Sequence, residues 1–153
     1  MPLHHVAIAV KDMDESLKFY RDGIGLNIFQ DEVISSPDLD ASLLVRNGKV
    51  RMVLLADAAA NMIELLGWIN PVVRGRPKEF KNFTSIGLVE VAFMVPDLKQ
   101  AEESLARIGY KFRSPVWSFG SDLPSYGGAH ADMRYVLDPN GVQVELMQVV
   151  MGK

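Results

Sequence analysis

The chain has 153 residues, of which 48% are hydrophobic, and its 16 basic and 19 acidic residues give a net charge of −3. This size fits one compact domain with a core that needs no covalent staples, and charges dispersed along the chain argue against nucleic acid or an anionic membrane as a partner. Because the chain has no cysteine, disulfides, thiolate zinc sites and cysteine nucleophiles are excluded, and any metal must be bound by His, Asp or Glu.

The chain begins directly with strand-like sequence, without the basic segment and apolar core of a signal peptide. Each long apolar stretch is interrupted by a charge, as at Arg51, Asp57 and Glu64. We therefore expect a soluble, cytoplasmic protein.

The first predicted module, residues 1–68, opens with the strand LHHVAIAV at 3–10. Asp12 can cap a following helix, whose apolar residues recur at helical spacing until Gly25, and an extended segment comes next. Residues 36–48 are compatible with a short capped helix or a loop. VRMVLLAD at 50–57 and NMIELLGW at 61–68 are predicted strands.

A segment rich in Pro, Gly and basic residues, 69–85, is the predicted linker to a second module, 86–153. The second module repeats the first: VEVAFMVPDL matches the opening strand and capping residue without a gap, and a helix ending near Gly109 follows. Two more strands, ADMRYVLD and GVQVELMQV, close the module. The chain is thus predicted to be an α+β protein of two βαβββ modules.

The repeat aligns the imidazole of His5 with the carboxylate of Glu90. Because side chains alternate across a strand, four predicted strands each place one ionisable residue on a face of apolar or small residues. These residues are His5, Glu64, Glu90 and Glu145. A carboxylate on such a face is costly to desolvate unless something compensates it, and a divalent cation is the simplest compensation if the four converge. The alternatives are a structural histidine and glutamates that face solvent.

This pattern resembles the vicinal oxygen chelate superfamily, which includes glyoxalase I, methylmalonyl-CoA epimerase, extradiol dioxygenases and bleomycin-resistance proteins. The resemblance rests on LHHVAIAVKDMDESLKFYRDGIGL, MIELLGW, GLVEVAFMVPDL and YVLDPNGVQVELMQ, and it covers nearly the whole chain. It implies that the two modules form a curled mixed sheet around a metal-binding cleft. The metal ligands that it implies, one from the first and one from the last strand of each module, are His5, Glu64, Glu90 and Glu145.

Glu90 departs from the family pattern, because most metal-binding relatives have His there. Three carboxylates and one divalent ion leave a local charge of −1, which favours a hard or borderline ion such as Mn²⁺, Mg²⁺, Fe²⁺, Co²⁺, Ni²⁺ or Zn²⁺. The departure also permits a second arrangement, in which Glu90 stays unbound and acts as a base. Glu90 and Glu145 are the candidate catalytic residues.

The resemblance implies a glyoxalase-like or epimerase-like isomerase or lyase that acts through a metal-stabilised enolate on a small oxygenated substrate. The alternatives are an extradiol-type dioxygenase, which normally needs two His and one carboxylate, and a metal-free protein that sequesters small molecules. Two-module relatives commonly pair, so a homodimer is expected. Candidate substrate contacts lie on or beside the strands that carry the ligands, or in the loop SYGGAH: Trp68, Met94, Tyr135, Met147 and His130.

Overall fold

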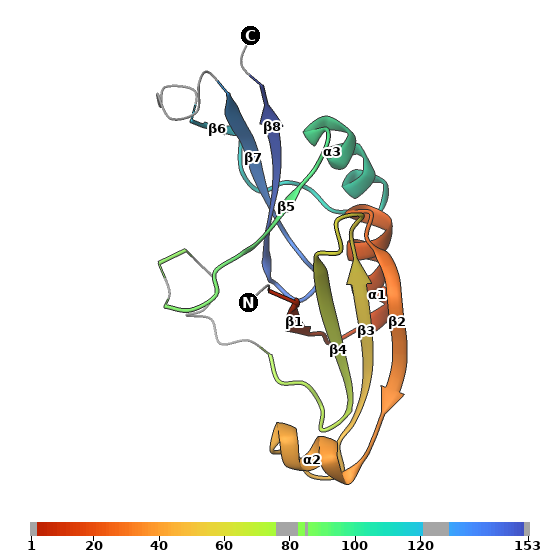
Figure 1. The fold of residues 1–153 in the computed structure, drawn as a ribbon. Coiled ribbons are helices and arrows are strands. Elements are labelled where there is room, and N and C mark those ends of the chain that lie inside the picture. The colour runs from red at the N-terminus through yellow and green to blue at the C-terminus, as the bar shows by residue number, and fades with distance from the viewer. Residues whose placement is uncertain (1–2, 76–82, 85, 121–128, 152–153) are drawn as a thin grey trace. The chain divides into compact units, whose positions relative to one another are not determined.

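The computed structural model describes residues 3–75, 83–84, 86–120 and 129–151. The chain divides into two compact units, Met1–Gly75 and Arg76–Lys153. Each unit contains one four-stranded sheet with a helix after its first strand (Figure 1). The α+β class and the two βαβββ modules are therefore confirmed, whereas the limits of the predicted linker, 69–85, stay a prediction.

The first unit has the strand order β1-β4-β3-β2. Strand β1 runs parallel to β4, and the other neighbours are antiparallel. A short helix, α1, leads into a π-helical segment, η1, and a second helix, α2, lies between β2 and β3. The elements are β1(His5–Ala9), α1(Met13–Leu17), η1(Lys18–Gly23), β2(Asn27–Ile34), α2(Pro37–Leu43), β3(Lys49–Ala56) and β4(Met62–Asn70).

The second unit repeats this topology with the strand order β5-β8-β7-β6. Strand β5 is parallel to β8, and β7 is antiparallel to both β8 and β6. In each unit the first strand therefore lies at the edge of the sheet, beside the last strand, which is central. The elements are β5(Val91–Met94), α3(Leu98–Arg107), β6(Trp117–Phe119), β7(His130–Leu137) and β8(Gln143–Val150).

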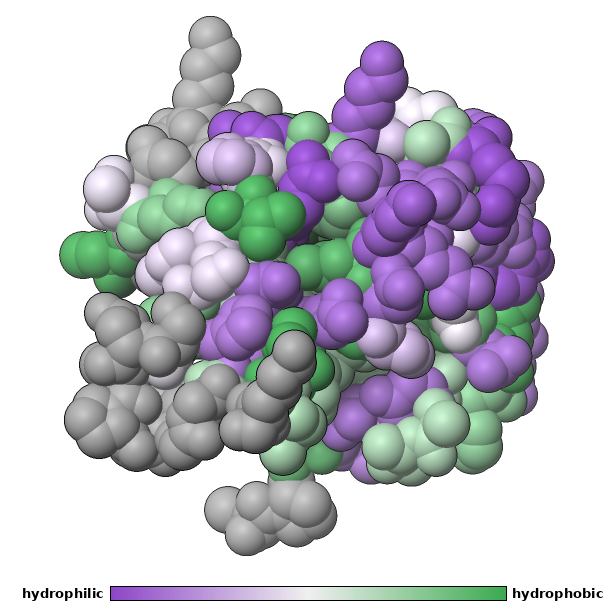
Figure 2. Space-filling view, turned by 90° about the horizontal axis from the view of Figure 1, so that it is seen from above, coloured by the Kyte–Doolittle hydropathy of each residue, from purple (hydrophilic) through white to green (hydrophobic). Residues whose placement is uncertain are grey.

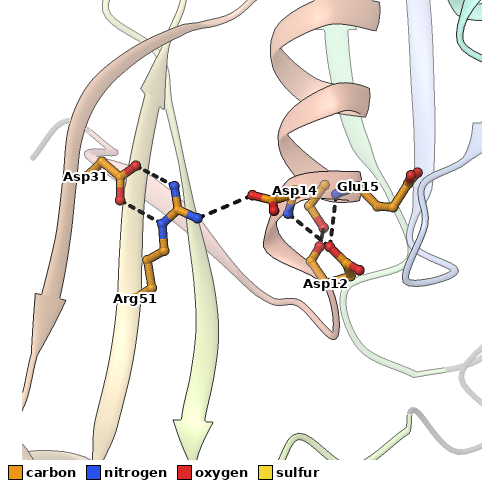
Figure 3. A network of polar contacts seen from close by, with 6 residues as sticks. Asp12, Asp14, Glu15, Asp31 and Arg51 are labelled. Carbon is orange, nitrogen blue, oxygen red and sulfur yellow. Dashed lines mark hydrogen bonds and ion pairs between the residues drawn. The ribbon is translucent and has the colours of Figure 1, made fainter.

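The predicted capping residues begin the first helix of each unit. The Asp12 carboxylate accepts hydrogen bonds from the backbone N–H groups of Asp14 and Glu15 (Figure 3), and Asp97 accepts one from Gln100. These bonds satisfy N–H groups that have no partner within the first helical turn. At the other end, Gly25 and Gly109 take positive φ values of 96° and 91°, which glycine adopts without steric cost.

Three local features go beyond the sequence interpretation. The first helix changes to π-helical geometry at Lys18. The segment 36–48, which was compatible with a helix or a loop, contains α2, because Ser36 accepts a hydrogen bond from the Leu39 N–H and Pro37 occupies the first turn. Glu90 lies one residue before β5 rather than inside it.

Buried apolar residues line the helix-facing side of each sheet, and Leu54 and Met133 are also buried on the other side. In the first unit, Ile8 and Val10 are buried, while Ala7 and Ala9 on the opposite side of β1 are exposed. The prediction that the branched face of this strand packs inward is confirmed. Helix α1 packs on β4 and α3 packs on β8. The side of each sheet away from its helix is therefore the side that carries the predicted ligands.

Arg51 on β3 ties three elements of the first unit together (Figure 3). Its Nε and Nη2 donate to the two oxygens of Asp31 on β2, at 2.9 and 2.6 Å, and its Nη1 lies 3.4 Å from Oδ1 of Asp14 on α1. The hydrogen bond from Arg51 holds the pKa of Asp31 below its usual range. Two parallel bonds from one guanidinium to one carboxylate fix the geometry of both side chains.

Hydrophilic residues cover much of the face seen in Figure 2, and hydrophobic residues are exposed among them. None of the helices in the described part of the chain is long and apolar enough to cross a membrane.

Candidate metal centre

Strand register gives Glu64 and Glu145 equivalent positions in the two units. Ala7 on β1 pairs with Glu64 on β4, and Ala92 on β5 pairs with Glu145 on β8. His5, two residues before Ala7 in β1, shares the face of that alanine. Glu90 stands at the matching position, two residues before Ala92 and one residue before β5 begins. The two units thus present matching pairs of ionisable side chains, as the gap-free repeat indicated.

In the first unit, His5 and Glu64 lie close enough to act as one pair. Nε2 of His5 is 3.5 Å from Oε2 of Glu64, and both side chains are partly buried. Nδ1 of His5 lies 2.8 Å from Nδ1 of His4. His4 precedes β1, so the alternation of side chains within that strand does not hold it away from His5.

In the second unit, Glu145 is 7% exposed and Glu90 faces it. Burial, and then the negative charge of Glu145, raise the pKa of Glu90. Oε2 of Glu90 is a buried oxygen with no hydrogen-bond partner among the described residues. An oxygen of this kind is costly because nothing replaces the water that it loses, unless a proton or a cation binds there.

Tyr135 on β7 is the direct neighbour of Glu145 across the strand pair. Burial first, and then the interaction of its hydroxyl with the Glu145 carboxylate, raise the pKa of Tyr135. Its ring makes an edge contact with Phe83, with centroids 5.0 Å apart. Tyr135 is thus a neighbour of a predicted ligand, and its predicted contact with substrate stays a prediction.

The donor chemistry of both pairs suits a divalent cation. Carboxylate oxygens and an imidazole nitrogen are ligands for Mn²⁺, Fe²⁺, Co²⁺, Ni²⁺ and Zn²⁺. The Oε2 atom of Glu90 has no hydrogen-bond partner among the described residues, so its lone pairs are available to such an ion. Each unit brings two of the four predicted ligands together. No group of three or more His, Asp or Glu side chains positioned to hold a metal occurs within the described residues.

The model of the Glyoxalase/Bleomycin resistance protein/Dioxygenase superfamily matches residues 2–146. The chain belongs to this superfamily. No curated protein gives a significant match.

Solved structures of superfamily members share the fold at low sequence identity. A glyoxalase family protein from Bacillus cereus is 16% identical, with a TM-score of 0.83 over 98% of this chain and 95% of that one. A glyoxalase/dioxygenase from Nostoc punctiforme is 18% identical, with a TM-score of 0.66 over 96% and 90%. The trypanothione-dependent glyoxalase I of Leishmania major is 18% identical, with a TM-score of 0.64 over 97% and 86%.

The remaining predicted substrate contacts of this superfamily member fall in different places. Trp68 on β4 shares the face of Glu64 and is half-buried, and Met94 on β5 shares the face of Ala92 and is 71% exposed. His130 begins β7 on the face opposite Tyr135, with Nε2 3.5 Å from Asp132. Met147 on β8 shares the face of Glu145 and is half-buried. The roles of these four side chains in substrate binding stay predictions.

Proposed function

We propose that the chain is a divalent-metal-dependent isomerase or lyase of the glyoxalase or epimerase type, acting on a small substrate with oxygens on neighbouring atoms. One ion per chain would be bound by four side chains: His5, Glu64, Glu90 and Glu145. The observation that carries the proposal is the buried, unpartnered Oε2 of Glu90 beside Glu145. Superfamily membership and the matching registers of the two units support it.

Tyr135 and His4 would hold ligands in place. The Tyr135 hydroxyl interacts with the carboxylate of Glu145, and Nδ1 of His4 lies 2.8 Å from Nδ1 of His5, which leaves Nε2 of His5 directed at Glu64. Partners of this kind orient the side chains that bind a metal and fix the tautomer of a histidine.

The proposed reaction moves a proton on the carbon next to a substrate carbonyl. A bound divalent ion would polarise the carbonyl and stabilise the negative charge that the lost proton leaves behind. In the second arrangement, in which Glu90 stays unbound, it is suited to accept this proton, because burial and the charge of Glu145 raise its pKa and its Oε2 has no donor competing for it. Glu145 is engaged by Tyr135, so it is the weaker candidate for the base.

Metal content is the first test. Protein purified without added metal, and the same protein titrated calorimetrically with Mn²⁺, Fe²⁺, Co²⁺, Ni²⁺ and Zn²⁺, should show near-stoichiometric binding of at least one ion. His5→Ala and Glu145→Ala should abolish it. Absence of binding across the series would contradict the proposal and favour a metal-free binding protein.

A substitution at Glu90 separates its two roles. Glu90→His keeps a ligand but removes the carboxylate base, so metal binding should persist, with a shift toward softer ions, while proton transfer falls by roughly 10² to 10⁴. Proton transfer is measured as deuterium uptake from solvent at the carbon next to the carbonyl, by NMR, on a panel of 2-hydroxy ketones and 2-oxo acids. Unchanged uptake in Glu90→His would show that Glu90 serves only as a ligand.

A further inference from the structure

Strand register arranges the ligand-bearing face of the second unit in rows. One row crosses the sheet through Ala92, Glu145 and Tyr135. The next row lies two residues away on each strand. It continues onto β6, because Trp117 pairs with Met133. Register partners share a face and lie within contact distance of one another. We name this second row the methionine row: Met94, Met147, Met133 and Trp117.

The methionine row is apolar and open at both ends. Met94 is 71% exposed and Trp117 is 53% exposed, whereas Met133 between them is buried. The ring of Phe119, on the same face of β6, makes an edge contact with Trp117 at a centroid distance of 5.6 Å. Large exposed apolar side chains often mark a binding surface, and here Met94 and Trp117 are the accessible ends of the row.

The corresponding row of the first unit has a different character. It runs through Ala9, Leu66, Met52 and Glu32, so it ends in a charged residue where the second unit has Trp117. The folding pattern of the repeat therefore does not require an exposed thioether and indole at these positions. An exposed apolar row is therefore a feature of the second unit, which also carries the unpartnered Oε2 of Glu90.

We propose that the methionine row binds an apolar, preferably aromatic, group of the same substrate whose oxygens would bind the metal ion held by Glu90 and Glu145. This inference rests on the proposed function and deepens it by naming the substrate class. Two residues along a strand span about 6.6 Å, which is close to the reach of a phenyl group attached next to the chelating oxygens. No charged side chain stands in the methionine row to compete for that space.

The chemistry of the row suits an aromatic group of variable shape. Methionine side chains have three rotatable bonds and a polarisable sulfur that makes favourable contacts with rings, so they adapt to the group that they bind. An exposed indole adds a large apolar surface at low entropic cost. Binding of a ring should therefore be favoured over binding of a methyl group at the same position.

The test compares two chelators that present the same vicinal oxygens but differ in their apolar group, benzohydroxamate and acetohydroxamate. Each is titrated into the full-length, Zn²⁺-loaded protein by calorimetry, and tryptophan fluorescence is followed in parallel. Benzohydroxamate should bind at least 10-fold more tightly and change the emission of Trp117. Trp117→Ala and Met94→Ala should each reduce that preference several-fold while leaving the affinity for acetohydroxamate within about 2-fold. Phe29→Ala, at a 68% exposed position on β2 of the first unit, is the matched control and should leave the preference unchanged.

The possible outcomes separate this inference from the proposed function. If neither hydroxamate binds, the chelating site itself fails, and the inference fails with it. If both bind with equal affinity, the chelating site stands and the role of the methionine row is wrong. Dissociation of a dimer in Trp117→Ala, seen by sedimentation together with an unchanged preference, would assign the row to a second copy of the chain and also overturn the inference.

Discussion

At the residue scale, the carboxylate of Glu90 is poorly accommodated in the metal-free protein. Its buried Oε2 has no hydrogen-bond partner, and the neighbouring charge of Glu145 opposes its ionisation. Glu90→Gln removes the charge and supplies an amide that can donate to Glu145. We expect the free energy of unfolding of the metal-free protein to rise by about 1 kcal/mol, or a few degrees in Tm, in calorimetric scans at neutral pH.

Metal affinity of the same variant should fall, because the neutral amide is a weaker ligand than the carboxylate. Glu103→Gln, at an exposed position on α3, is the control and should change neither property. A Glu90→Gln variant that is less stable without metal would contradict the interpretation of Glu90 as an uncompensated charge.

Tyr135 is the second residue whose role is local and testable. Its hydroxyl interacts with the largely buried carboxylate of Glu145, and Tyr135→Phe removes this interaction. Denaturant unfolding should show a loss of about 1 to 2 kcal/mol. In a double-mutant cycle with Glu145→Gln, the two losses should fall short of additivity by about 0.5 kcal/mol or more. Strict additivity would mean that the two side chains do not act as a pair.

At the element scale, the bond pair between Arg51 and Asp31 joins β2 to β3. Because the hydrogen bond lowers the pKa of folded Asp31, folding favours the ionised form. The stabilisation is complete above the unfolded pKa of about 3.9 and is lost as the pH falls through the lower folded value. Asp31→Asn should therefore cost about 0.5 to 1 kcal/mol at pH 7, a modest figure because both side chains are partly exposed.

Urea unfolding at pH 7 and at pH 2.5 checks this prediction, since the difference between wild type and Asp31→Asn should shrink at the lower pH. Asp22→Asn is a matched control. Asp22 also pairs with an arginine, Arg21, but the two are adjacent in sequence and join no separate elements. Equal losses in both variants would show that the cross-strand position of Asp31 adds nothing.

At the scale of the whole molecule, we expect a homodimer, as is common for two-module relatives and for symmetric assemblies in general. Sedimentation velocity at micromolar concentration should give a single species with twice the mass of the chain. The Phe29→Ala and Trp117→Ala variants should sediment as the wild type does, because the methionine row is assigned to substrate. A monomer at that concentration would contradict the prediction.

The sequence by itself determined the local elements and the repeat. Hydrophobic alternation and the capping residues Asp12 and Asp97 specify their strands and helices through nearest neighbours, so they can be recognised without knowledge of the fold. The gap-free repeat identified the equivalent positions of His5 and Glu90, and the family resemblance identified the superfamily that the comparison then confirmed. The ligand set remained a prediction, because two carboxylates that share a face need not share a metal.

The tertiary structure decided which side chains meet across strands. Tyr135 pairs with Glu145 because of the register between β7 and β8, and Arg51 reaches Asp31 and Asp14 because β3 lies beside β2 and below α1. The methionine row likewise exists only through three strand registers. Alternation along one strand predicts on which face of the sheet a side chain lies, but not which residue of the adjacent strand lies beside it. Sliding a strand by two residues keeps every side chain on its face and changes every cross-strand partner.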